Sequence, residues 1–167
     1  MNEDSTVEIF PCPEQKGHWI IEAKQWLPSP LDEVFPFFAD AFNLSELTPP
    51  WLKFDVLTPA PIEMRAGALL DYRLKLHGIP IKWRTEIEEW KPPYQFVDTQ
   101  LKGPYKRWHH LHSFKELNGG TVVEDRVVYR PLGGWLANKL LVERDLKRVF
   151  SYRQDVLEKR FAKKVAS

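Results

Sequence analysis

Residues 135–164 read WLANKLLVERDLKRVFSYRQDVLEKRFAKK, and this stretch decides how the rest of the chain can fold. It contains neither Gly nor Pro, and its Leu, Val and Phe residues recur at the spacing of an α-helix. The spacing predicts one long C-terminal helix after Gly133 and Gly134, and its apolar stripe needs a partner surface. The predicted stripe consists of Leu136, Leu140, Leu146, Val149, Phe150, Arg153, Val156, Leu157 and Phe161.

The partner surface must come from the segment before this helix, which has the pattern of a series of strands. Its runs alternate between apolar and polar residues, and Gly, Pro and Asn-Gly-Gly signals separate them. The short connections leave no room for crossover helices, so the pattern predicts an antiparallel meander and disfavours parallel nucleotide-binding folds. A phosphate-cradling glycine loop is also missing from the sequence. We expect strands at residues 53–58, 69–77, 79–90, 95–102, 105–115 and 121–130.

A further strand and two short helices are expected before the meander. The strand is predicted at residues 18–27, HWIIEAKQWL. Ser29 is then a candidate N-cap with Pro30 at the first helical position, and Pro36 limits this helix to a short one. The second short helix is expected after Asn43 and before the next two prolines.

Composition describes one ordinary globular domain. The chain has 167 residues, 43% of them hydrophobic, and its 24 basic and 23 acidic residues leave a formal charge of +1. This balance argues against a protein built to hold nucleic acid, because phosphate binding needs a clustered basic surface. Residues 1–18 show little periodicity and are interpreted as a loose N-terminal leader or a short first strand, and residues 19–164 as a single domain.

Location is predicted from the cysteine content and the apolar runs. Cys12 is the single cysteine, which favours a reducing, cytoplasmic compartment over an oxidised secreted fold. The apolar runs are too short for an integral membrane segment, and the polar, acidic start does not resemble a secretion signal.

Aromatic residues are unusually frequent. The chain has 7 Trp, 5 Tyr and 10 Phe, and these 13% concentrate in the middle of the sequence. Large rings suit a wide core as well as the lining of a ligand cavity, so composition leaves both interpretations open.

The order of strand, two short helices, antiparallel strands and one long terminal helix resembles the START-like superfamily. This superfamily is also called SRPBCC or birch-pollen-allergen-like, and the likeness is strongest to its polyketide cyclase and dehydratase-like group. The stretches that carry it are LPSPLDEVFPFFADAFNLSELTPPWLKFDVL at 27–57, GALLDYRLKLHGIPIKWRTEIEEWKPPYQFVDTQLKGPYKRWHHLHSF at 67–114 and VEDRVVYRPLGG at 123–134. The resemblance implies an α+β helix-grip fold, in which a curved antiparallel sheet wraps around the C-terminal helix and leaves a cavity. It identifies a fold better than a reaction, because the superfamily includes lipid carriers, hormone receptors, cyclases and quinone-binding proteins.

Alternation along each strand then predicts which side chains face that cavity. On residues 105–115 the set that contains Trp108 and Phe114 is the better inward candidate, because it carries the large rings. A register error of one residue would exchange the two faces of a strand. The predicted inward residues are Leu70, Tyr72, Leu74, Leu76, Trp83, Thr85, Ile87, Phe96, Asp98, Gln100, Trp108, His110, His112, Phe114, Val123, Asp125, Val127 and Tyr129.

Five of these residues would form a polar group inside an otherwise apolar space: Asp98, Gln100, His110, His112 and Asp125. Three interpretations remain open. The group satisfies its own hydrogen bonds and fixes the sheet; it orients the polar head of a hydrophobic ligand; or it performs catalysis. For the second, the predicted ligand-binding residues are Tyr72, Trp83, Asp98, Gln100, Trp108, His110, His112, Tyr129 and Phe150.

In the catalytic interpretation, His110 or His112 would act as the base in an aldol-type cyclisation or dehydration. Asp98 or Asp125 would orient that imidazole. A hydroxyl from Tyr72 or Tyr129 would donate to the developing enolate oxygen.

His110 and His112, at positions i and i+2 of a strand, point the same way and could supply two imidazoles to one metal ion. Asp98 or Asp125 could add a third ligand, but a second well-spaced ligand pair is missing and the resemblance implies no metal dependence. We therefore expect neither a metal nor a cofactor. His77 is predicted to face solvent in a turn, and His109 to face outward.

Charge is distributed unevenly along the chain. Residues 139–164 contain nine Lys or Arg against four Asp or Glu, whereas residues 32–46 contain only acids among their charged residues. The basic helix is interpreted as a solvated face or as a docking site for an anionic membrane or an acidic partner. Arg144 and Arg153 could alternatively pair with a carboxylate at the cavity mouth. The segment TPPWLKF, with Trp51, is a candidate portal loop.

Three functions from different classes follow from these observations. The leading one is the binding of a hydrophobic small molecule such as a lipid, quinone or polyketide-like compound, with weak catalysis or none. The first alternative is a cyclase, dehydratase or hydrolase that uses the same polar group. The second is a protein-interaction domain whose interior is filled by its own side chains.

Overall fold

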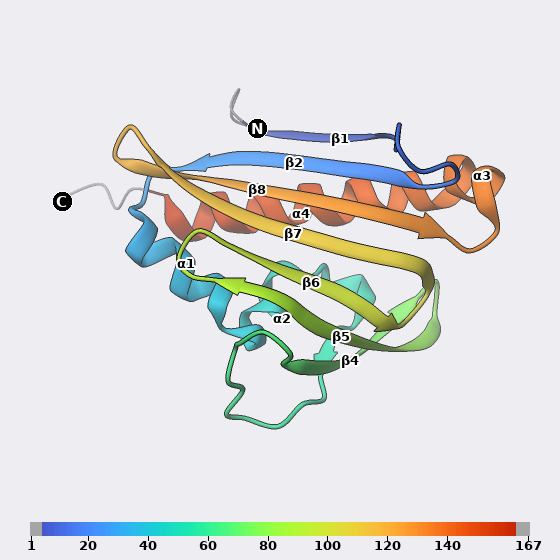
Figure 1. The fold of residues 1–167 in the computed structure, drawn as a ribbon, viewed down its shortest axis with the longest axis horizontal. Helices are drawn as coiled ribbons and strands as arrows, with labels where there is room; N and C mark the ends of the chain where they lie inside the picture. The colour runs from blue at the N-terminus through green and yellow to red at the C-terminus, as the bar shows by residue number, and fades with distance from the viewer. Residues whose placement is uncertain (1–4, 163–167) are drawn as a thin grey trace.

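The computed structural model describes residues 5–162 of the chain as one sheet wrapped around one long helix (Figure 1). Most boundaries lie within two residues of the predicted ones, and β6 has the predicted ends. The elements are β1 Thr6–Pro11, β2 Trp19–Leu27, α1 Leu31–Ala39, η1 Ala41–Asn43, α2 Leu44–Leu47, η2 Pro50–Leu52, β3 Asp55–Val56, β4 Leu69–Leu76, β5 Ile79–Lys91, β6 Gln95–Lys102, β7 Tyr105–Leu117, β8 Gly120–Pro131, α3 Gly134–Ala137, η3 Asn138–Val142 and α4 Glu143–Phe161.

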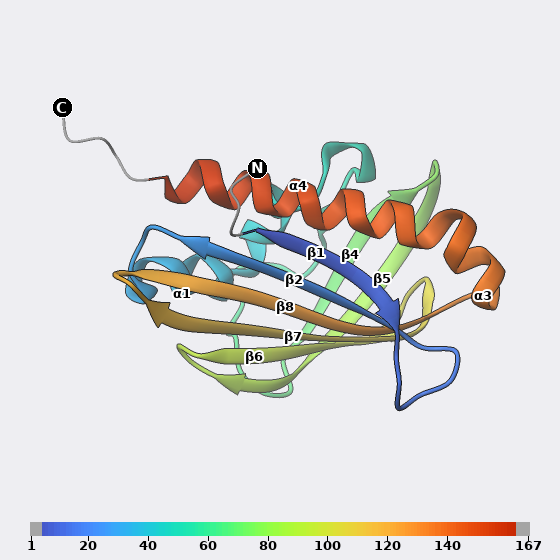
Figure 2. The same ribbon diagram turned by 90° about the horizontal axis from the view of Figure 1, so that it is seen from above.

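The sheet is antiparallel throughout and has the strand order β1-β2-β8-β7-β6-β5-β4-β3. The last strand, β8, returns to pair with β2, so the first two strands and the last strand lie together on one side of the sheet. Register shifts within the β5–β6 pair, at Arg84/Thr85 and at Ile87/Glu89, mark bulges that bend these strands. The sheet is therefore curved and its edges do not meet, and α4 lies along its concave side (Figure 2). This architecture confirms the predicted helix-grip fold.

The N-terminal residues differ from the predicted leader. Thr6–Pro11 forms an edge strand that pairs with β2, from Thr6 opposite Lys24 to Pro11 opposite Trp19. The prediction of a loose leader is wrong for these residues, and the alternative of a short first strand describes them. The sheet therefore begins before residue 19. The predicted domain end at residue 164 lies outside the described residues.

The start of α1 also differs from the prediction. The helix begins at Leu31, one residue later than predicted, and Pro30 occupies the N-cap position without a side-chain hydrogen bond. Ser29 is buried, and its hydroxyl donates to the backbone carbonyl of Phe161 at the end of α4, 3.3 Å away. The predicted cap therefore joins two helix ends instead. Pro36 lies inside this nine-residue helix.

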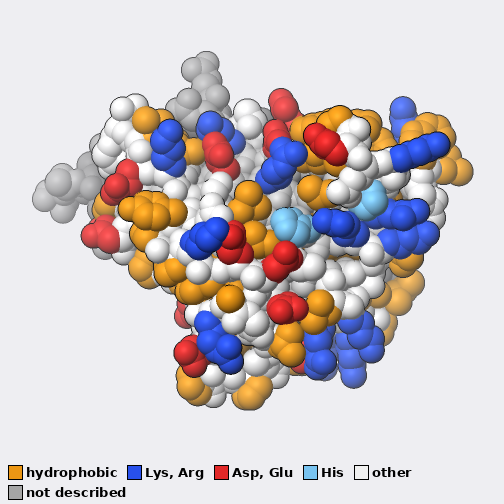
Figure 3. Space-filling view, in the orientation of Figure 1, with side chains coloured by type: hydrophobic (Ala, Val, Ile, Leu, Met, Phe, Trp, Pro, Cys, Tyr) orange, Lys and Arg blue, Asp and Glu red, His pale blue; other side chains and the backbone are white. Residues whose placement is uncertain are grey.

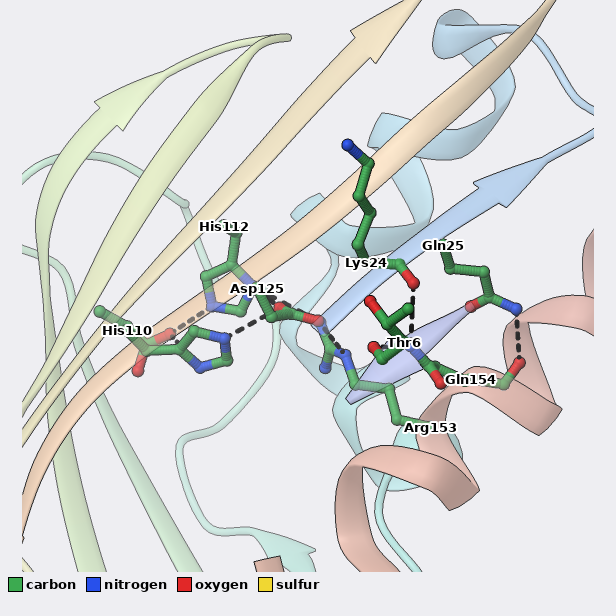
Figure 4. A network of polar contacts seen from close by, with 9 residues as sticks. Thr6, Lys24, Gln25, His110, His112, Asp125, Arg153 and Gln154 are labelled. Carbon is green, nitrogen blue, oxygen red and sulfur yellow. Dashed lines mark hydrogen bonds and ion pairs between the residues drawn. The ribbon is translucent and has the colours of Figure 1, made fainter. Parts of the chain in front are cut away.

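Glutamine side chains hold α4 in place against the first two strands (Figure 4). The Gln154 amide donates to the carbonyls of Thr6 and Lys24, at 2.9 and 3.1 Å. Gln25 in turn donates to the backbone carbonyl of Gln154 at 3.0 Å. These bonds fix the rotation of the helix, so that the neighbouring residue, Arg153, faces the interior of the sheet.

The predicted apolar stripe of the C-terminal helix is confirmed for residues in α4. For residues before α4 the prediction is wrong. Leu146, Phe150 and Leu157 are buried, whereas Leu136 and Leu140 are 58% and 68% exposed. The reason is the π-helical turn Asn138–Val142, which adds a residue to the helical repeat and rotates the preceding residues away from the sheet. Among the described helices, none combines the length and the apolar character that crossing a bilayer requires.

Candidate functional site

A cavity of about 400 Å³ lies between the sheet and α4. Its wall is mostly apolar and includes the rings of Phe54, Tyr72, Trp83, Trp108 and Phe150. This volume is within the range of small-molecule sites. The interior is therefore not filled by the side chains of the chain itself, which counts against the interaction-domain alternative.

The mouth of the cavity is marked by the exposed residues of its lining. Trp51, on η2, is 48% exposed, and its ring packs against Tyr152 and beneath the Arg148 guanidinium of α4. On the other side His77, in the β4–β5 turn, contacts Asp145 at 2.6 Å. The predicted turn position of His77 and the portal position of Trp51 both agree with this arrangement.

The central strand β7 supplies the two imidazoles, and its neighbours supply one carboxylate each. His110 and His112 alternate inward with Trp108, and all three are buried. In the register of the sheet, His110 lies opposite Asp98 of β6 and His112 opposite Asp125 of β8. The alternation that predicted these inward faces is confirmed on every strand that contributes to the group.

The two imidazoles stack on each other between the two carboxylates (Figure 4), with ring centroids 3.7 Å apart. On one side, Asp98 Oδ2 lies 2.6 Å from His112 Nε2 and 3.7 Å from His110 Nδ1. On the other side, Asp125 Oδ1 lies 2.9 Å from His110 Nε2 and 3.1 Å from His112 Nδ1. Each ring therefore has a carboxylate at both of its nitrogens.

Arg153 completes the group from α4. Its Nε and a terminal nitrogen lie 3.1 Å from the two oxygens of Asp125, a bidentate pair in which both side chains are buried. The predicted pairing of Arg153 with a carboxylate is thus found, but in the interior and not at the mouth. Arg144 instead lies near Asp145 at 3.7 Å and is exposed. We call Asp98, His110, His112, Asp125 and Arg153 the buried charge cluster.

The charges within the cluster balance one another. Burial would raise the pKa of the Asp125 carboxyl, but Arg153 and the two imidazoles hold it well below its usual value. Burial likewise opposes ionisation of Asp98, yet the histidines lower the pKa of this carboxyl too. Both side chains are therefore carboxylates.

The two histidines have opposite shifts. Burial would lower the pKa of His112, but hydrogen bonds that it donates to the Asp125 and Asp98 carboxylates raise that pKa above the ordinary value. Burial and the charge of His112 lower the pKa of His110. The cluster therefore favours the protonated form of His112 over that of His110, and the Arg153 guanidinium adds a positive charge beside Asp125.

Two predicted ligand-binding residues lie away from the cavity. Gln100 folds over Gly103, and its amide bonds both the N–H and the carbonyl of Tyr105, which closes the β6–β7 turn. The Tyr129 hydroxyl donates to Asn138 Oδ1 at 2.8 Å beneath the start of the helix. Neither lines the cavity. Strand parity placed both inward but could not show that local partners use their polar atoms.

Other lining residues were missed by the sequence analysis. Leu44 and Leu47 of α2 and Leu52 of η2 line the cavity on the side opposite β7. The apolar positions of the second short helix were visible in the sequence, but nothing there indicated that they face the same space as the strands. His109 lies on the other face of β7, near Glu88, as predicted.

One part of the cluster has a composition suited to metal ligands. Asp98, His110 and His112 each offer one ligand atom, and these atoms lie within 4.8 Å of one another. The rings are stacked, however, and their nitrogens already face carboxylates, so an ion would have to displace the hydrogen between Asp98 and His112.

Comparison with models of known protein families identifies the family of this chain. The family model described as polyketide cyclase/dehydrase and lipid transport matches residues 27–154. The chain belongs to this family. No curated protein matches the sequence.

Solved structures of the same fold are distant in sequence. The Zhui aromatase/cyclase from Streptomyces sp. R1128 is 14% identical, with a TM-score of 0.69 over 90% of this chain and 97% of that one. Protein Ms6760 from Mycobacterium smegmatis is 15% identical, with a TM-score of 0.66 over 93% and 97%. Ara h 8.0201 is 13% identical, with a TM-score of 0.61 over 86% and 99%. At these identities the likeness shows the helix-grip fold and not a shared reaction.

Proposed function

We propose that this protein binds a hydrophobic small molecule, such as a lipid, quinone or polyketide-like compound, in the cavity between the sheet and α4. The observation that carries the proposal is an open space of about 400 Å³ with aromatic and aliphatic walls, polar residues at its mouth and part of the buried charge cluster in its interior wall. Family membership supports it, since the family description includes lipid transport.

The cavity offers separate positions for the two parts of such a ligand. Trp83, Trp108 and Phe150 would contact its apolar body, and burial of that surface drives binding. Its polar end would lie against Asp98 and His110, which line the same cavity.

Extraction tests the proposal directly. Denaturing mass spectrometry of the purified protein should release an apolar compound at close to one equivalent per chain. Val149→Trp, which fills the cavity from α4, should remove it, and Lys147→Trp, at an exposed position of the same helix outside the lining, should retain it. Blank extracts of the wild type, together with no binding of added alkylbenzenes, would refute the proposal.

A cyclase or dehydratase activity is the second candidate, and the paired histidines favour it. A neutral His110 next to a protonated His112 places a proton acceptor and a proton donor side by side at the cavity wall. In an aldol step, His110 would take a C–H proton while the carbanion attacks a ketone carbon, and His112 would protonate the new alkoxide. Loss of water from a linear poly-β-ketone thioester, detected by mass spectrometry, should then require both histidines. A carrier would show only weaker binding in His110→Ala and His112→Ala.

We also propose peripheral contact with an anionic membrane, from a cytoplasmic location. One end of the molecule exposes large apolar side chains: Leu132, Trp135, Leu136, Leu140 and Leu141. We call these five residues the apolar patch. The basic side chains around it are Lys102, Lys106, Arg107, Arg130 and Lys139, and residues 101–107 and 130–142 contain no acidic residue. Figure 3 shows basic and apolar side chains together at the end where α3 lies in Figure 1. Trp and Leu beside Lys and Arg suit the interface of an anionic bilayer.

A further inference from the structure

The buried charge cluster uses nearly all of its own hydrogen-bonding capacity. Both nitrogens of His110 and of His112 face carboxylate oxygens, at 2.6 to 3.7 Å. Both oxygens of Asp125 accept from Arg153. His110 Nδ1, 3.7 Å from Asp98 Oδ2, lies beyond hydrogen-bond distance, but the other atoms bond to one another and are poor candidates for direct ligand contacts.

Asp98 keeps one oxygen that is incompletely satisfied. Its Oδ2 accepts from His112, while its Oδ1 has the Thr85 hydroxyl at 3.5 Å, a long distance for a hydrogen bond. That hydroxyl lies closer to the backbone carbonyl of Thr99, at 3.0 Å, and its single hydrogen suits that acceptor better. The Asp98 side chain is 20% exposed and lines the cavity. Its Oδ1 is therefore an acceptor available to a ligand.

The Tyr72 hydroxyl is the second available group. Tyr72 lines the same cavity, is only 7% exposed and has no hydrogen-bond partner among residues 5–162. Phe54 packs against its ring with centroids 5.1 Å apart and restricts its orientation. Burial and the negative charge of Asp98 raise the pKa of Tyr72, so the phenol keeps its proton. The hydroxyl is not one of the fully buried unpartnered side-chain atoms, so it is open to the cavity, where a ligand can accept its hydrogen.

The charge balance of the cluster selects against charged ligands. Since the cluster already holds two buried carboxylates, which use the contacts of His112 and Arg153, an added carboxylate would place a third negative charge beside them. It would also approach the free oxygen of Asp98, which repels it and has no hydrogen to donate. An uncharged group that both donates and accepts avoids both costs.

We propose that the polar end of the ligand is an uncharged hydroxyl, of an alcohol or a phenol, which donates to Asp98 Oδ1 and accepts from the Tyr72 hydroxyl. This inference rests on the proposed binding function and names the class of ligand: hydroxylated hydrophobic molecules in preference to fatty-acid-like carboxylates. Asp98 and Tyr72 are then the residues that determine specificity, and the histidines and Arg153 hold Asp98 ionised and in place.

Three probes that share the same apolar body test the proposed preference for an uncharged hydroxyl. They are 4-octylphenol, octylbenzene and 4-octylbenzoate, compared at pH 7. Isothermal titration calorimetry, with quenching of Trp83 and Trp108 fluorescence as a second readout, should show the phenol binding about tenfold or more tightly than either of the others. Tyr72→Phe should weaken phenol binding about fivefold and leave octylbenzene unchanged. Asp98→Asn should reduce the preference of phenol over benzoate by about tenfold or more.

Matched controls separate specificity from folding. Tyr94→Phe and Asp155→Asn change the same residue types at exposed positions outside the lining and should keep the wild-type affinities. Equal affinity for all three probes, or a phenol preference that survives in both Tyr72→Phe and Asp98→Asn, would overturn the inference and leave the binding function standing. No binding of any probe, with blank extracts, would refute the binding function itself.

Discussion

At the scale of single residues, Asp125 depends on Arg153 more than on any other partner. The carboxylate is buried on β8, and the guanidinium contacts both of its oxygens from α4. An isolated buried carboxylate would be strongly destabilising, because the cost of removing its charge from water is large. The pair therefore joins the helix to the sheet and makes the charged cluster possible in an apolar interior.

Replacing Arg153 with Met should destabilise the fold by about 3–5 kcal/mol, because it removes the countercharge and leaves Asp125 buried. The matched control is Arg160→Met on the same helix, where the guanidinium pairs with Glu46 and both side chains are more than 40% exposed. That change should cost at most about 1 kcal/mol. Urea unfolding at pH 7 measures both free energies. Equal losses in the two variants would contradict the role assigned to Arg153.

At the scale of single elements, the sequence predicts strands better than it predicts helix phase. The alternation of β7 and β8 follows directly from the two-residue repeat, so Trp108, His110 and Asp125 could be placed on the inner face from the sequence. Leu136 and Leu140 could not be placed correctly, because the π-helical turn between α3 and α4 interrupts the 3.6-residue repeat. Nothing in the residues 135–142 marks that turn as different from a regular helix.

The Tyr129 hydroxyl anchors the start of this helix, and Tyr129→Phe tests that assignment. The bond to Asn138 joins β8 to the π-helical turn, and both side chains are fully buried. Removing the hydroxyl leaves the Asn138 oxygen without its donor and should cost about 1–3 kcal/mol in urea unfolding. Binding of 4-octylphenol should not change, because Tyr129 does not line the cavity. Weaker binding with unchanged stability would instead support the ligand-binding role that strand parity suggested.

At the scale of the whole molecule, the sequence predicts the architecture but not how distant parts converge. The element order predicted the curved sheet and its helix, and hence a cavity with His110 and His112 in its wall. It could not show that Arg153 reaches Asp125, since that contact depends on the rotation of α4 set by the Gln154 hydrogen bonds. Contacts between residues far apart in the chain cannot be predicted from the spacing of residues within one element.

The gathering of exposed apolar and basic residues is also a property of the whole molecule. The apolar patch follows β8, and the basic residues of the β6–β7 turn become its neighbours because Tyr105 pairs with Pro131 and Arg107 with Arg130. The Lys139 ammonium lies over the Trp135 ring, 5.8 Å from its centroid. The proposed membrane contact uses this gathering, since contiguous exposed apolar side chains rimmed by polar ones are typical of interaction sites.

Sedimentation with lipid vesicles should show binding to mixed phosphatidylserine and phosphatidylcholine membranes and much weaker binding to phosphatidylcholine alone. Trp135→Ala combined with Leu140→Ala should lower the partition coefficient about tenfold or more, because both side chains lose their burial in the interface. Leu117→Ala, at the last residue of β7 and the opposite end of the sheet, removes a similar exposed side chain and should have little effect.

Salt separates the two contributions to this binding. Raising the ionic strength should release the wild type partially, since attraction of Lys106, Arg107 and Lys139 to the anionic surface is screened while apolar burial is retained. Binding that is equal on neutral and anionic vesicles, or that the Trp135 and Leu140 substitutions leave unchanged, would contradict membrane docking by this end. A defined dimer that these substitutions dissociate would assign the apolar patch to a second copy of the chain instead.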